Sequence, residues 1–102
     1  MISDNYIYKY MVQGNMAKKH TVKSVEQFQH VLDALIPNEQ IKVEFAIDSY
    51  LVTRIHPNLF PRAFLCENVL SGCAKVFDSI ELIDEKIIAL TYENKHIASI
   101  QL

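Results

Sequence analysis

The side chains that could do chemistry are few and widely spaced in this chain of 102 residues. The histidines are His20, His30, His56 and His96, and the cysteines are Cys66 and Cys73. No histidine has a second histidine or a cysteine at the spacing typical of a metal site, and six residues separate the two cysteines. The sequence therefore predicts no metal ligand.

The sequence also contains little that would indicate nucleophilic catalysis or phosphate binding. The chain has only two glycines, so it contains no glycine-rich phosphate loop, and it contains no nucleophile elbow. Cys66 or Cys73 could pair with His56 as nucleophile and base. Two cysteines in a reducing compartment are more often small buried hydrophobic residues, however. We therefore expect no catalytic residue and no cofactor.

Three groups of residues could instead contact a partner protein. Alternating tyrosines in an N-terminal strand would form an aromatic stripe, two large apolar residues between Pro57 and Pro61 would sit on a stiff loop, and an acidic segment could complement a basic partner. The candidate partner-binding residues are Tyr6, Tyr8, Tyr10, Leu59, Phe60, Asp84 and Glu85. The tyrosines could also cover a helix, and the loop could also close one end of the core.

The uneven charge raises the alternative of a nucleic-acid partner. The net charge is −2, but residues 1–25 hold four lysines against one aspartate, whereas residues 26–102 hold eleven acids against six bases. The candidate nucleic-acid-binding residues are Lys9, Lys18, Lys19 and Lys23. Four lysines without an arginine make a small electrostatic footprint, so we rank nucleic acid below a protein partner.

The segment of residues 24–55 has the clearest local signals. Ser24 and Gln27 have the spacing of a capping box, and apolar residues then recur at three- and four-residue steps until Pro37. This pattern predicts one long helix over about residues 25–36. Apolar and polar residues alternate over residues 41–47, and residues 50–55 can pair back after a turn at Asp48 and Ser49.

The remainder of the chain is harder to assign. Pro61 and Gly72 suit the two ends of a second, short helix over about residues 62–71, although two strands around residues 68–72 are the alternative. Residues 80–83, 87–93 and 96–102 are rich in β-forming residues. A two-residue turn at Asn94 and Lys95 would place Leu90 opposite Ser99. We thus expect one α+β domain, residues 1–102, with an antiparallel sheet packed against both helices.

These observations favour a small non-catalytic binding protein that acts through protein–protein interaction, in the manner of an inhibitor or an immunity-type accessory protein of bacteria. A nucleic-acid-binding domain and a small-ligand-binding domain are the alternatives. No apolar run is long enough to span a bilayer and no signal peptide is evident, so we expect a cytoplasmic protein without a membrane partner. Residues 96–102 carry no charged side chain, and this strand either lies inside the sheet or pairs across the two-fold axis of a homodimer.

Overall fold

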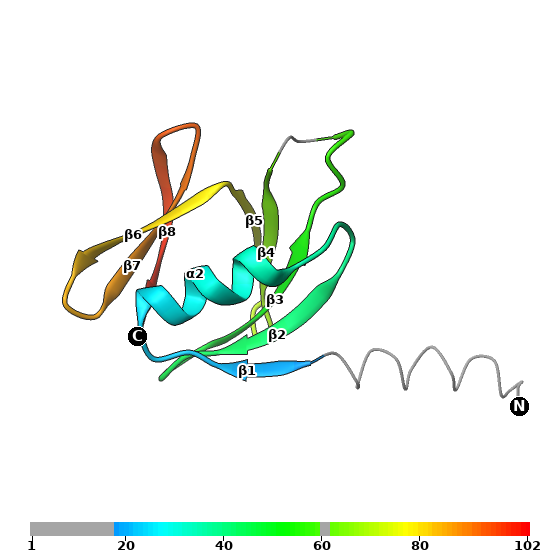
Figure 1. The fold of residues 1–102 in the computed structure, drawn as a ribbon. Helices are drawn as coiled ribbons and strands as arrows, with labels where there is room; N and C mark the ends of the chain where they lie inside the picture. The colour runs from blue at the N-terminus through cyan, green and yellow to red at the C-terminus, as the bar shows by residue number, and fades with distance from the viewer. Residues whose placement is uncertain (1–17, 60–61) are drawn as a thin grey trace, which may run out of the picture.

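The computed structural model describes residues 18–59 and 62–102, which form two sheets and one helix (Figure 1). The larger sheet has the order β1 (Lys19–Thr21), β2 (Gln40–Glu44), β3 (Ser49–Arg54), β4 (Phe64–Asn68) and β5 (Ala74–Phe77). The smaller has the order β6 (Ser79–Asp84), β7 (Ile87–Tyr92) and β8 (Lys95–Gln101), and the helix is α2 (Val25–Ala34). The described part of the chain is therefore mostly β. The predicted single sheet with one long and one short helix is wrong.

Helix α2 begins where the sequence predicts. Ser24 has an extended backbone, and its Oγ accepts a hydrogen bond from the N–H of Gln27 at 3.1 Å. The Gln27 side chain accepts in turn from the N–H of Lys23 at 2.7 Å, one residue before the position expected of a capping box. The helix ends at Ala34, two residues earlier than predicted, and the side chain of Ile36 is consequently 63% exposed.

The strands on either side of α2 lie parallel and next to each other. His20 of β1 is in register with Val43 of β2, and α2 is the crossover that a parallel pair requires. Strand β3 then returns antiparallel to β2, as predicted, and its Val52 lies opposite Ile41. The buried side chains of these strands and the buried face of α2 belong to one apolar cluster, so the helix covers this part of the larger sheet (Figure 1).

Residues 62–71 do not form the predicted helix. They contain β4, in which Phe64 and Cys66 point into the core while Leu65 and Glu67 lie on the other face. Val69 and Leu70, which lie within the range of the predicted helix, are instead exposed in the turn that follows β4. Gly72 has a φ of +75° and helps to close this turn instead of ending a helix. The two-strand alternative is the one that the structure adopts.

Strand β6 carries the chain from the larger sheet into the smaller one. Only Asp78 separates β5 from β6, and its N–H donates to the carbonyl oxygen of Thr91 at 2.8 Å. Phe77 at the end of β5 is fully buried, stacks on Phe64 at a centroid distance of 5.3 Å and lies 6.3 Å from Phe28. Phe28 and Phe45 are 0% and 8% exposed and meet edge to face at 5.2 Å, so α2 packs against the end of β2.

The hairpin of β7 and β8 has a different register from the predicted one. The turn residues are Glu93 and Asn94, which both have positive φ, as a type I′ turn requires. Tyr92 therefore lies opposite Lys95. A bulge on β8 then places Leu90 opposite Ala98, one residue before the predicted partner. The sequence misleads here because an Asn-Lys turn and a Glu-Asn turn differ by only one residue.

Strand β8 lies at one edge of the smaller sheet, with β7 as its only strand neighbour among the described residues. The predicted N-terminal strand with the tyrosines falls in residues 1–17, outside the described part of the chain. The predicted homodimer stays a prediction. Among residues 18–59 and 62–102, the helix is neither long nor apolar enough to cross a membrane.

Candidate protein-binding surface

The predicted partner-binding residues do not come together in one place. Tyr6, Tyr8, Tyr10, Lys9 and Phe60 lie outside the described residues. Leu59 is 73% exposed in the loop between β3 and β4. Asp84 ends β6, and Glu85 follows it in the turn to β7. Figure 1 shows this loop and this turn at opposite ends of the molecule, so they make two separate surfaces.

The surface around Asp84 and Glu85 is an edge of the smaller sheet. Strand β6 pairs only with β7, so its other side has no neighbouring strand in the described part of the chain. Five of its six residues are exposed, and Ile80 is the one that packs against the core. The backbone groups on the open side of such a strand can hydrogen-bond to an incoming extended segment.

Two aliphatic side chains of β6 face solvent. Leu82 is 44% exposed and Ile83 is 51% exposed. Leu82 lies opposite Ile88 and Asp84 lies opposite Ile87, so Ile83 is an extra residue in a bulge. The sequence pattern did not identify these two residues as surface residues, because an alternating apolar strand is normally half-buried.

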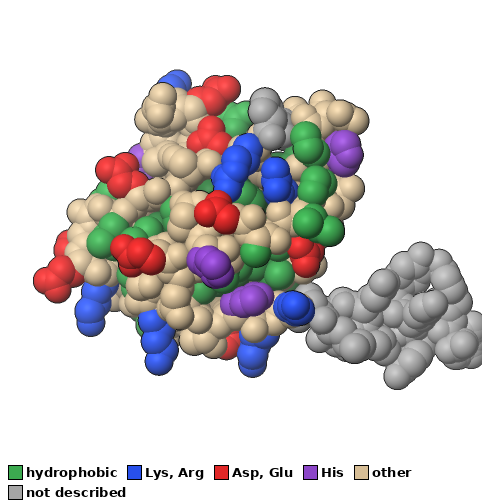
Figure 2. All heavy atoms as spheres, viewed as in Figure 1, with side chains coloured by type: hydrophobic (Ala, Val, Ile, Leu, Met, Phe, Trp, Pro, Cys, Tyr) green, Lys and Arg blue, Asp and Glu red, His purple; other side chains and the backbone are tan. Residues whose placement is uncertain are grey.

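Acidic side chains surround the two aliphatic ones. Glu81, Asp84 and Glu85 are all exposed, and Lys86 is the only base between positions 79 and 86. The Asp84 carboxylate accepts a hydrogen bond from the N–H of Glu85 at 2.6 Å, which orders the start of the turn. Figure 2 shows hydrophobic side chains among acidic ones at this end of the molecule. We call residues 81–85 the acidic edge.

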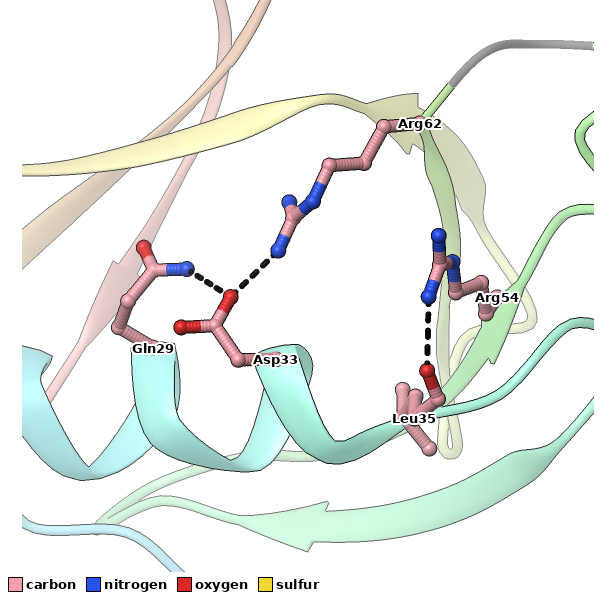
Figure 3. Close-up of polar contacts among 5 residues, drawn as sticks. All are labelled: Gln29, Asp33, Leu35, Arg54 and Arg62. Carbon is pink, nitrogen blue, oxygen red and sulfur yellow. Dashed lines mark hydrogen bonds and ion pairs between the residues drawn. The ribbon is translucent and has the colours of Figure 1, made fainter.

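The surface around Leu59 is stabilised by two arginines that flank the β3–β4 loop (Figure 3). Arg62 forms an ion pair with Asp33 of α2, and Gln29 donates to the same carboxylate at 3.0 Å. Arg54 donates to the carbonyl oxygen of Leu35 at 2.9 Å. This bond satisfies a carbonyl at the helix C-terminus, where the helix dipole favours a cation.

The Leu59 surface is apolar but carries no excess of one charge. Ile36 and Leu59 are exposed in the α2–β2 and β3–β4 loops. Figure 2 shows a row of hydrophobic side chains at this end of the molecule. The neighbouring charges, Arg62 and Asp33, neutralise each other. Compared with the acidic edge, this surface lacks both an open strand and a charge that would select a partner.

The predicted nucleic-acid-binding lysines that the structure describes are Lys18, Lys19 and Lys23, and Lys19 lies in register with Lys42 of β2. Lys19 lies 3.7 Å from the carboxylate of Glu44 on the neighbouring strand, and Lys18 precedes it. Lys23 lies just before the helix cap. The nucleic-acid alternative has no new support from this arrangement and stays a prediction.

The two cysteines differ strongly in their surroundings. Cys66 is 3% exposed in β4, and burial raises the pKa of its thiol to about 12, so it stays protonated near neutral pH. Cys73 is exposed in the segment that follows β4, whereas His56 lies in the loop that precedes β4. The two residues are therefore at opposite ends of this strand, which gives no support to a nucleophile–base pair between them. The described residues contain no group of three potential ligands that could hold a metal ion.

No protein-family model matches the chain, and no curated protein or solved structure is significantly similar to it. The surfaces described above are therefore the basis for assigning a function.

Proposed function

We propose that this is a small non-catalytic binding protein that acts through protein–protein interaction, and that the acidic edge is its binding surface. One observation carries this proposal: an open edge strand exposes Leu82 and Ile83 between acidic side chains. An inhibitor or an immunity-type accessory protein needs a surface of this kind and no catalytic group.

The apolar part of the acidic edge would supply affinity. An added strand would pair with the open backbone of β6 and cover the exposed area of Leu82 and Ile83. Burial of apolar area is favourable by roughly 25 cal/mol per Å². Proteins commonly protect edge strands with charges and bulges, and β6 has both. Its two exposed aliphatic side chains are the features that such protection does not explain.

The charged part of the acidic edge specifies the partner's chemistry. Glu81, Asp84 and Glu85 face solvent, and only Lys86 opposes them in this segment. The complementary partner is an extended protein segment in which lysine or arginine alternates with aliphatic residues. Complementary charge increases the association rate and excludes acidic competitors, and added salt weakens it.

The test uses the full chain and two synthetic ten-residue peptides that alternate valine with either lysine or glutamate. We expect the lysine peptide to shift the backbone amide signals of β6 in NMR spectra, and the glutamate peptide to shift none of them. Leu82→Ser with Ile83→Ser should abolish the shifts, because the apolar contact is lost. The matched control, Ile36→Ser with Leu59→Ser, removes two aliphatic side chains at the other end that are more exposed than Leu82 and Ile83, and it should leave the shifts unchanged.

Two results would contradict the proposal. One is equal binding of the two peptides, which would remove the role of the acidic side chains. The other is a set of shifts confined to residues outside the smaller sheet. Both variant pairs change surface residues, which usually alters the free energy of unfolding by no more than about 0.5 kcal/mol, so loss of folding should not obscure the result.

A further inference from the structure

A groove runs along α2 on the side of β1. It consists of two hollows of about 360 and 250 Å³, and both are lined by His20, His30 and Val31. The first hollow is also lined by Glu26, which precedes His30 by one helical turn. The groove therefore brings together two histidines and a carboxylate that are distant from the acidic edge in the sequence.

The two histidines come from different elements that face each other. His20 is in register with Val43, whose buried side chain lies on the helix-facing side of the larger sheet, so His20 points to the same side. His30 is exposed on α2. Figure 2 shows two histidine side chains next to each other, one over the helix and one over β1, and each of these elements contains one histidine.

Neither imidazole has a competing interaction within the described part of the chain. No side-chain hydrogen bond or ion pair there involves the imidazole of His20 or His30. The other two histidines are engaged: His56 Nδ1 accepts from the N–H of Asn58 at 3.1 Å, and His96 Nε2 lies 2.8 Å from the Ser99 hydroxyl. Among the four histidines, the groove thus holds the two whose imidazoles have no hydrogen-bond partner among the described residues.

We propose that His20 and His30 bind one borderline divalent cation, such as Zn²⁺, Ni²⁺ or Cu²⁺, in this groove. Neutral imidazole is a preferred ligand of these ions, and nitrogens bind Zn²⁺ at about 2.0–2.1 Å. The exposed side chain of His30 can reach that geometry by rotation about its side-chain bonds. This site is independent of the proposed binding at the acidic edge.

The protein supplies two ligands and water completes the coordination shell. The described residues contain no group of three ligands placed to hold a metal ion, so Glu26 is not a direct ligand in the observed conformation. Its carboxylate, in the same hollow, can accept a hydrogen bond from a metal-bound water. A site with two protein ligands binds reversibly, and it links β1 to α2 when it is filled.

The experiment uses the full chain with Cys73→Ser, because the exposed thiol of Cys73 would compete for the same ions. Isothermal titration with Ni²⁺ near pH 7.5 should show one ion per chain. His20→Ala and His30→Ala should each remove this binding, whereas the control His56→Ala should retain it. The electron paramagnetic resonance spectrum of Cu²⁺ bound to the parent chain should show coupling to two imidazole nitrogens, and either single variant should lose this signal.

Two results would contradict the proposal. Ni²⁺ binding that persists in the His20→Ala and His30→Ala double variant would overturn the proposal, and so would loss of binding in His56→Ala. Because His30 lies on the exposed side of α2, His30→Ala should fold normally, and its circular dichroism spectrum checks this.

Discussion

The two sheets use strands of similar sequence pattern in different ways. Strand β2 reads QIKVE and buries both of its aliphatic residues, Ile41 and Val43. Strand β6 reads SIELID, yet it exposes Leu82 and Ile83. Strand β2 lies between two other strands, and its apolar residues join the same core cluster as those of α2, whereas β6 is an edge strand. Position in the sheet, more than the apolar pattern itself, decides which residues are buried.

This difference separates two roles within a small domain. The helix side of the larger sheet contains the interlocked aromatic side chains and provides stability. The smaller sheet contributes Ile88, Leu90 and Ile100 to the same core. Its strand β6, however, has a strand neighbour on one side only in the described part of the chain. Substitutions in the first region should therefore change the free energy of unfolding, and substitutions of the exposed residues Leu82 and Ile83 on β6 should change binding alone.

The largest effect is expected for Phe28→Ala. Phe28 is completely buried and contacts the rings of Phe45 and Phe77, so its loss should reduce the free energy of unfolding by roughly 3–5 kcal/mol. Phe45→Ala should have a similar effect. Chemical denaturation measures both, with Leu82→Ser as the matched surface control. A comparable loss in Leu82→Ser would show that β6 is part of the core and would remove the contrast between the regions.

Ile100→Ala tests whether β8 belongs to the stable region. Ile100 is 2% exposed and lies opposite the fully buried Ile88, so truncation should cost roughly 2–5 kcal/mol. Thermal unfolding would detect this loss, and deletion of residues 100–102 should be at least as damaging. If Ile100→Ala unfolds like the parent protein, the smaller sheet contributes little to the core.

The predicted homodimer would form through the edge of β8 that does not pair with β7. Sedimentation velocity at micromolar concentration distinguishes a dimer from a monomer. We expect the parent chain to be a dimer and the Gln101→Pro variant to be a monomer, because proline removes a backbone hydrogen-bond donor at this edge. A monomer at all concentrations would remove this proposal without affecting the acidic edge.

The buried thiol of Cys66 should make the free energy of unfolding moderately dependent on pH. Burial raises the pKa of its thiol from 9.0 to about 12, so the folded state keeps the proton where the unfolded chain loses it. The contribution of the protonated thiol to the free energy of unfolding is complete below pH 9. It decreases above pH 9, by roughly 1.4 kcal/mol per pH unit at most, until the pKa of the folded state is reached. Cys66→Val should flatten this slope in denaturation experiments between pH 8 and 10, whereas Cys73→Val should preserve it.

The smallest effect is expected for Ser24→Ala. This change removes the hydrogen bond to the N–H of Gln27 and should cost about 1 kcal/mol. The midpoint of thermal unfolding should fall while binding at the acidic edge stays the same. Ser79→Ala, a change of the same kind at the start of β6, serves as the control outside the helix. An unchanged midpoint for Ser24→Ala would mean that the cap does not stabilise α2.

The sequence by itself determined the elements whose signals are local. Ser24 and Gln27 mark the start of α2, because a cap depends on residues three positions apart. The alternation in residues 41–47 predicts β2, although the strand ends at Glu44, and the β2–β3 hairpin follows from the nearby turn. The contact of Phe28 with Phe45 was also predictable, since consecutive elements usually pack together.

The tertiary structure decided what depends on distant neighbours. The apolar spacing of residues 62–71 suits a helix as well as a strand, and β4 forms because Cys66 pairs with Val52 on one side and Lys75 on the other. His20 and His30 line one groove only because β1 lies parallel to β2 with α2 above them. Strand β6 exposes Leu82 because no further strand covers it within the described chain, and a sequence pattern does not record where a sheet ends.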